Sequence, residues 1–287
     1  MEWLLTKLCI EDIYFAELFA KLGSSCTSDG SVGPQSHYIE FTNEQAFLFR
    51  LLSKCLSERP REVTVSNEFA LGVPKILKEA SDSVASSSRG SSELPTGSPA
   101  IDVLGYSLLI LRDICAWEHF SSPDTEPPVN SLLSAGILEL VLNLLRELEP
   151  PLIVKKSIAH ANKQEVQPDT AETKKVCPYK GYRRDLVSVI SNCLRTRKQV
   201  QDEVRERNGI LLLLQQCVID EDNPFLREWG LLAIWNLLDG NLENQNEVAE
   251  LQLQGPVQTP EIANLGLKVE VDEKSGRAKL VNIPSCK

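Results

Sequence analysis

Two stretches decide the fold of this chain: Asn192-Cys-Leu194 followed by Gln201-Asp-Glu-Val204, and Asn236-Leu-Leu238 followed by Gln245-Asn-Glu-Val248. The second set repeats the first at a constant offset of 44 residues. In and around both sets, apolar residues return every three or four positions, which is typical of a helix with one buried stripe. The chain therefore contains an internal repeat built from short amphipathic helices.

A period in the low forties within helical sequence is typical of armadillo or HEAT solenoids. Each repeat in such a fold is a bundle of two or three helices that completes its core only by stacking on a neighbour. We therefore predict an all-α protein, an armadillo-like α-solenoid, with a short β-hairpin at the C-terminus.

Outward from the repeat, amphipathic runs predict helices over most of the chain. The predicted helices cover residues 3–22, 42–56, 67–80, 98–117, 129–148, 179–194, 199–207, 209–218, 223–238 and 243–253. Asn223-Pro224 predicts one helix start, because Asn caps orphan amides and Pro at the first helical position needs no donor.

Two segments interrupt the helical pattern. Residues 81–100 are rich in Ser with Gly and Pro and predict a loop, whereas residues 149–178 predict a linker with a short helix near residues 154–163. The resulting organisation is armadillo-like helices at 1–80, a Ser-rich loop at 81–100, further helices at 101–148, a linker at 149–178 and a C-terminal domain at 179–287.

The tail alternates apolar and polar residues in Leu267-Lys-Val-Glu-Val-Asp272 and again in Arg277-Ala-Lys-Leu-Val-Asn282. The residues between them, Glu273-Lys-Ser-Gly276, are typical of a turn, so the pattern predicts a β-hairpin. Because an isolated hairpin is marginally stable, we expect it to pack on the last helices.

Composition limits the possible functions. The net charge of −10 and the pI near 5.0 lack the positive field that binders of nucleic acid or anionic membranes use. The first twelve residues have no basic start, and Glu2 and Glu11 interrupt their apolar run, so no signal peptide is predicted. Eight cysteines are spread singly without a C-x-x-C pair, which indicates reduced structural thiols in the cytosol or nucleus.

No motif for catalysis is present. The sequence lacks G-x-G-x-x-G, G-K-[ST], H-E-x-x-H and G-x-S-x-G. We therefore expect no catalytic residues, no cofactor and no metal site, and a protein that binds other proteins instead of catalysing a reaction.

The segment Glu228 to Val248 looks like an armadillo third helix with the turn that follows it. More narrowly, Tyr179-Lys-Gly-Tyr-Arg-Arg184, Asn223-Pro-Phe-Leu-Arg-Glu-Trp229 and the closing hairpin together resemble the C-terminal domain of the ataxin-10 family. The resemblance covers roughly residues 178–284. It implies a cytoplasmic setting with links to signalling, cell survival and cytokinesis. Met1 opens directly on an apolar-striped helix, which suggests that repeats precede this chain in longer relatives.

Asn192 and Asn236 are the first candidate partner-binding residues. In armadillo proteins that bind extended peptides, an Asn at this point of the third helix faces the groove and hydrogen-bonds the ligand backbone. Nuclear-import adaptors add a Trp four residues earlier, where this chain has Ser188 and Leu232. The alternative is that both Asn side chains bond to the adjacent helix or loop. Trp235 is expected to point towards a neighbouring helix.

Three further residues are candidates for partner binding. Arg183 and Arg184 could bind an acidic partner; the alternative is that they lie in a solvated helix start. Trp229 could face the groove; the alternative is that it packs in the core. We interpret the chain as a scaffold for other proteins, with self-association possible and with no nucleic-acid or membrane partner. The alternatives are a transport adaptor for extended basic peptides, or a regulatory subunit of an enzyme.

Overall fold

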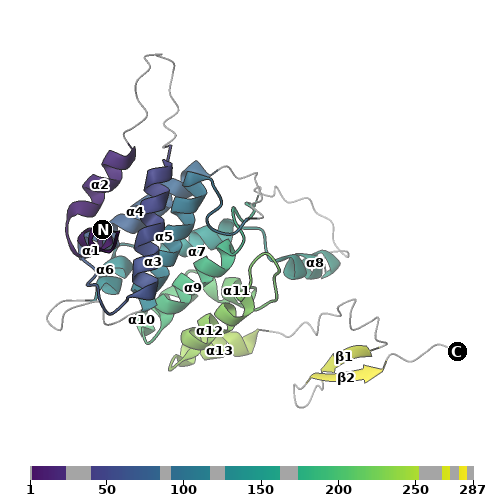
Figure 1. Cartoon of the computed structure of the whole chain (residues 1–287). Helices are drawn as coiled ribbons and strands as arrows, with labels where there is room; N and C mark the ends of the chain where they lie inside the picture. Colours follow the sequence, from purple (N-terminus) through teal and green to yellow (C-terminus); the bar gives the residue numbers. More distant parts are fainter. Residues whose placement is uncertain are drawn as a thin grey trace, which may run out of the picture.

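The computed structural model describes residues 2–23, 40–84, 92–116, 127–161, 174–251, 267–271 and 278–282. These residues form thirteen α-helices and one two-stranded sheet, so the chain is mostly helical as predicted. Figure 1 shows most of these helices packed together, with the purple α1 and α2 at one end and the light-green α12 and α13 at the other, while α8 lies apart.

The first five helices form the N-terminal part of the stack. They are α1 (Glu2–Glu11), α2 (Tyr14–Gly23), α3 (Asn43–Glu58), α4 (Asn67–Ser83) and α5 (Pro99–Ala116). The single helix predicted over residues 3–22 is wrong, because the chain turns at Asp12 and Ile13. The turn lets Ile10 of α1 and Phe15 of α2 both enter the core.

The predicted Ser-rich loop is shorter than expected at both ends, because α4 continues to Ser83 and α5 begins at Pro99. Residues 85–91 lie outside the described part. Just before α5, the carboxylate of Asp102 accepts the backbone N–H groups of Thr96 at 2.6 Å and Gly97 at 3.3 Å. These bonds satisfy amides next to the helix start, so this end of the segment is held by hydrogen bonds.

Residues 129–148 also form two helices where one was predicted, α6 (Pro128–Ser134) and α7 (Ile137–Glu147). The break lies at Gly136, whose φ of 84° is the left-handed conformation that favours glycine. α8 (Leu152–Ala161) follows inside the predicted linker. The far end of that linker is attached to the stack, because Lys175 donates to the carbonyl of Glu147 at 2.8 Å.

The two copies of the repeat are visible in the backbone. Their helices are α9 (Tyr182–Leu194), α10 (Lys198–Glu206), α11 (Gly209–Leu214), α12 (Leu226–Leu238) and α13 (Leu242–Glu250). α9 begins after Gly181 (φ 102°) and α12 after Phe225 (φ 66°); Thr196 (φ 57°) and Gly240 (φ 65°) follow the same helices. Both pairs are 44 residues apart, so the period read from the sequence recurs in the dihedral angles.

The start of α12 differs from the prediction. Asn223 lies before the helix and does not cap it. Its Oδ1 instead accepts the backbone N–H of Arg183 at 3.0 Å, in the first turn of α9. The carbonyl of Asp222 accepts the N–H of Gly181 at 2.8 Å. The segment before α12 therefore caps α9, because α9 and α12 lie side by side (Figure 1).

One continuous core runs through the stack, since α3 packs on α5, α5 on α9, and α9 on α12. α9 is the most enclosed of these helices: all of its residues except Arg184 are buried. Six cysteines lie among the described residues and all are free thiols. No single described helix is long and apolar enough to cross a membrane. The pair α6 and α7, which are bent by 64° relative to each other, would be long and apolar enough only if both helices were taken together.

Strands β1 (Leu267–Val271) and β2 (Ala278–Asn282) pair antiparallel, with Leu267 opposite Asn282 and Val271 opposite Ala278. They fall within the two segments whose alternation predicted strands. Residues 252–266, which lead to β1, lie outside the described part. The expected packing of this tail on the last helices therefore stays a prediction.

Candidate interaction surface

Asn192 and Asn236 lie at the contacts between successive repeats. The Nδ2 of Asn192 donates to the carbonyl of Arg112 in α5 at 3.0 Å, and the Nδ2 of Asn236 donates to the carbonyl of Ser191 in α9 at 2.9 Å. Only 8% of Asn192 and 9% of Asn236 is exposed. The amides are engaged inside the stack, which corrects the expectation of a ligand-facing pair and agrees with the alternative of bonds to the adjacent helix.

The two bonds follow one rule, which we call the asparagine ladder: each Asn amide donates to a carbonyl of the preceding repeat. Ser191, the acceptor for Asn236, immediately precedes Asn192, which is the ladder residue of α9. In the same way Arg112, the acceptor for Asn192, immediately precedes Asp113, so Asp113 is the corresponding residue of α5. Asp113 is buried, and its Oδ2 has no partner among the described residues. Burial raises the pKa of its carboxyl, although the bond from Arg112 acts in the opposite direction.

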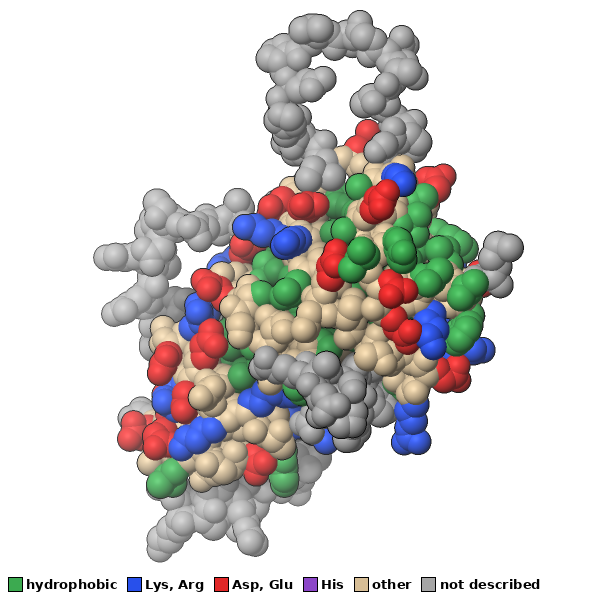
Figure 2. All heavy atoms as spheres, turned by 90° about the vertical axis from the view of Figure 1, so that its left-hand side faces the viewer, with side chains coloured by type: hydrophobic (Ala, Val, Ile, Leu, Met, Phe, Trp, Pro, Cys, Tyr) green, Lys and Arg blue, Asp and Glu red, His purple; other side chains and the backbone are tan. Residues whose placement is uncertain are grey.

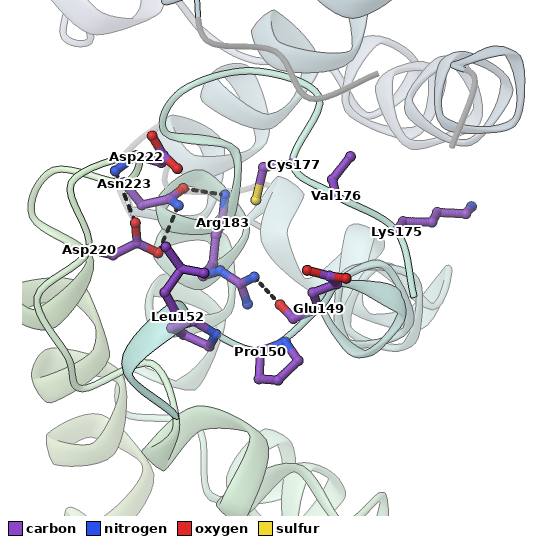
Figure 3. A pocket seen from close by; sticks show the side chains of 11 residues that line it. Glu149, Pro150, Leu152, Lys175, Val176, Cys177, Arg183, Asp220, Asp222 and Asn223 are labelled. Atoms are coloured by element: carbon purple, nitrogen blue, oxygen red, sulfur yellow. Dashed lines mark hydrogen bonds between the residues drawn. The ribbon is translucent and has the colours of Figure 1, made fainter. Parts of the chain in front are cut away.

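Arg183 is also an internal residue, with only 5% of it exposed. Its Nη1 donates to the Oε1 of Gln216 at 3.2 Å, and its Nη2 donates to the carbonyl of Glu149 (Figure 3). The side chain thus joins the start of the linker to the segment between α11 and α12. An acidic partner has no access to this guanidinium, which corrects the docking hypothesis for Arg183.

Figure 3 shows a small hollow beside Arg183. Its volume is about 40 Å³, which suits a few water molecules and no substrate. Its side chains are already paired in part, since Asn223 donates to Asp220 at 3.2 Å. Burial raises the pKa of the Cys177 thiol, which keeps it protonated and weakly nucleophilic.

Arg184 and Trp229 are more accessible than Arg183. Both Nε and Nη2 of Arg184 lie 2.8 Å from one carboxylate oxygen of Asp185, whose other oxygen accepts the Tyr179 hydroxyl at 2.9 Å. Trp229 is half-buried and packs against the core, in agreement with its core interpretation. Among the five candidates, only Arg184 and Trp229 have substantial exposed surface.

A group of exposed apolar side chains on α12 was not among the candidates. Leu231, Leu232 and Trp235 on α12 are 55%, 43% and 72% exposed. The expectation that Trp235 points to a neighbouring helix is therefore wrong. A signal was present in the sequence: residues 226–238 are apolar around most of the helix, beyond the single stripe that one buried face needs.

A second group of exposed apolar side chains lies on α1 and α2. Its members are Trp3, Leu4, Leu5, Leu8, Ile13 and Tyr14. Figure 2 shows hydrophobic side chains gathered over these two helices, interrupted by a few charges. Each end of the stack thus carries a group of exposed apolar side chains, and others are spread between them.

Other features of the described residues carry little chemistry. A hollow of about 490 Å³ lies between α4 and α7, lined by lysines and carboxylates together. One of these pairs, Lys175 and Glu147, is closed at 2.8 Å. In the described part of the chain, no three His, Cys, Asp or Glu side chains gather as a metal ligand set.

Residues 182–281 match the spinocerebellar ataxia type 10 protein domain. The ataxin-10 homolog of Dictyostelium discoideum is 38% identical over 105 residues, which are 37% of this chain and 17% of the relative. Ataxin-10 of Xenopus tropicalis is 34% identical over 103 residues (36% of this chain, 21% of the relative), and ataxin-10 of Homo sapiens is 37% identical over 90 residues (31% and 19%).

The matched part of the chain therefore spans only about a fifth of the length of these relatives. It contains α9, α12 and the asparagine ladder between them, together with both strands. In this C-terminal region, the chain is therefore similar to proteins of the ataxin-10 family.

Proposed function

We propose that this chain is a non-catalytic scaffold for protein–protein interactions, folded as an armadillo-like α-solenoid. The fold assignment is supported by the period of 44 residues and by the ladder, in which Asn192 and Asn236 make the same bond one repeat apart. Each repeat completes its core on its neighbour, as expected for a solenoid.

The observation that carries the function is a pair of groups of exposed apolar side chains, one on and between α1 and α2 and one on α12, at the two ends of the stack. Contiguous apolar patches on a protein surface mark interaction sites. By contrast, the hollow beside Arg183 holds only about 40 Å³, and its polar groups are largely engaged. The ends of the stack are therefore the surfaces best suited to function.

The partners we propose are other proteins, with self-association as a further mode. The family resemblance suggests a cytoplasmic setting and roles in signalling, cell survival and cytokinesis. An adaptor for extended peptides is disfavoured, because the Asn amides that would read a peptide donate to helix carbonyls.

Affinity purification from cytosol tests this proposal with the full chain and two charge variants. One variant carries Leu4→Glu and Leu8→Glu on α1, and the other carries Leu232→Glu and Trp235→Glu on α12. A matched control, Leu211→Glu, changes an exposed leucine on α11 that belongs to neither group. We expect each end variant to lose a distinct set of partners. Unchanged recovery in both end variants, with all proteins folded, would contradict the scaffold role of these ends.

A further inference from the structure

We propose that the outer side of α12 docks an amphipathic helix of a partner protein, with an apolar stripe flanked by basic side chains. This inference rests on the scaffold function and specifies one of its surfaces. We call the surface formed by Leu231, Leu232 and Trp235 the terminal face.

The repeat shows what kind of element fits the terminal face. Its residues correspond, 44 positions earlier, to Val187, Ser188 and Ser191 of α9. Those three residues are buried, and α12 packs on α9. The terminal face is thus the continuation of an interface that is already formed one repeat earlier. A helix in the same register covers it as α12 covers α9.

The described part of the chain supplies no such helix. α13 corresponds to α10, since Gln245 lies 44 residues after Gln201. α10 and α11 lead on to α12, which stacks on α9. After α13, however, the next described elements are β1 and β2. Within the described residues no helix completes the interface on α12, and we assign that place to a helix of a partner protein.

The ladder adds a polar requirement. Asn192 and Asn236 donate to the carbonyls of Arg112 and Ser191. The corresponding acceptor on the terminal face is the carbonyl of Trp235, which already accepts the N–H of Asp239 at 3.0 Å. A carbonyl oxygen has two lone pairs and accepts a second donor. The partner helix is therefore expected to carry Asn or Gln at its ladder position.

Charge defines the flanks. Glu228 precedes Leu231 and Leu232 by three and four residues, and Asp239 follows Trp235 by four, so both carboxylates lie along the same side of the helix. Both residues are exposed. Because the whole chain has a net charge of −10, a basic partner is also favoured at long range. These carboxylates select Lys or Arg beside the apolar stripe of the partner.

The test uses a synthetic lysine-rich helical peptide as the probe. It carries Leu, Ala, Ala, Asn and Leu at the spacing of the inner residues of α12, which are Leu226, Gly230, Ala233, Asn236 and Leu237. Fluorescence anisotropy of the labelled peptide reports its binding to the full chain. We expect saturable binding that weakens at high salt, because the flanking ion pairs are screened.

Protein variants locate the binding. Leu232→Glu and the milder Trp235→Ala are each expected to weaken binding about tenfold or more, because a buried apolar side chain is lost. The matched control Leu211→Glu should bind as the original chain does. Replacing the peptide Asn by Leu should weaken binding about fivefold, the value of one hydrogen bond.

Three results would overturn the proposal. They are the absence of binding at millimolar peptide, equal binding by Leu232→Glu and the original chain, and a dimer in sedimentation that Leu232→Glu converts to a monomer. The last result would assign the face to a second copy. The scaffold function is tested separately from these three results. If any of them occurs while cytosolic partners that depend on α1 are still recovered with Leu232→Glu, the scaffold function stands and only the terminal-face proposal is refuted.

Discussion

α9 and α12 are the same helix of two successive repeats, yet α9 packs between α5 and α12, whereas within the described residues α12 has no equivalent helix on its far side. Both begin after a residue with positive φ, and both use an Asn to donate to the preceding repeat. Only α12 exposes large apolar residues. The comparison shows that the repeat pattern sets the conformation of each helix, whereas its position in the stack sets how much each residue contributes to stability.

The largest expected difference lies at the ends of the two helices, where Leu194 and Leu238 are the same residue 44 positions apart. Leu194 is fully buried and Leu238 is half-buried. We expect Leu194→Ala to lower the free energy of unfolding by about 3 kcal/mol and Leu238→Ala by about 1 kcal/mol. Urea unfolding followed by circular dichroism measures both, and equal losses would refute the asymmetry.

Arg183 and Arg227 form the next matched pair. Arg183 donates to Gln216 and to the carbonyl of Glu149 from a buried position, whereas Arg227 pairs with Glu228 at the surface. Arg183→Met leaves these buried acceptors without a donor and should cost about 2 kcal/mol, while Arg227→Met should cost less than about 0.5 kcal/mol. Urea unfolding followed by circular dichroism measures the loss of stability in both variants. A cost at Arg227 as large as that at Arg183 contradicts the expectation.

The residues before the two helices give effects of opposite sign. Gly181 and Phe225 both have positive φ, which favours glycine. Gly181→Ala should destabilise by about 1 kcal/mol or more, because its Cβ is strained there. Phe225→Gly relieves the same strain and should stabilise by about 0.5 kcal/mol, after the entropy of glycine in the unfolded chain is subtracted. Thermal unfolding of both variants checks the signs, and destabilisation by Phe225→Gly would refute the strain.

The smallest effect extends the comparison to α5, where Asp113 takes the ladder position. Burial raises the pKa of Asp113, so the folded chain binds this proton more readily than the unfolded chain. Stability from this group is present at low pH and is lost as pH rises through the folded pKa. The Asn side chain of the Asp113→Asn variant does not ionise, so this variant does not lose stability in this way as pH rises. Its advantage over the original chain should grow as pH rises above the range in which an unperturbed Asp ionises.

Urea unfolding at several pH values measures that advantage, with Asp82→Asn on α4 as a control at an exposed site. A difference between Asp113→Asn and the original chain that is independent of pH would contradict this assignment.

The sequence predicted the helical class, the period and the approximate helices, because apolar spacing records which side of a helix is buried. It did not predict the turn at Asp12 or the break at Gly136, since the apolar pattern continues through both. Nor did it reveal that Asn223 caps α9, because the acceptor and the N–H of Arg183 are 40 residues apart in sequence. Contacts of that kind depend on how two repeats are placed.

The candidate site was predicted less well for a related reason. Asn192 and Arg183 have side chains that suit ligand binding, and the same groups satisfy buried carbonyls equally well. A single sequence does not distinguish these two uses. The exposed Leu232 and Trp235 were missed because an apolar residue on a helix is normally assigned to a core, and its exposure depends on whether a further helix follows in the stack.

The capping of α9 by the segment before α12 has a consequence for unfolding. The first turn of α9 uses Asn223, and the N–H of Gly181 uses the carbonyl of Asp222. If α12 separates, these donors at the start of α9 lose their acceptors and the side chains of α9 lose their cover. The two repeats should therefore unfold as one cooperative unit, with amide protons in α9 and α12 exchanging together and no stable intermediate in which α9 is folded alone.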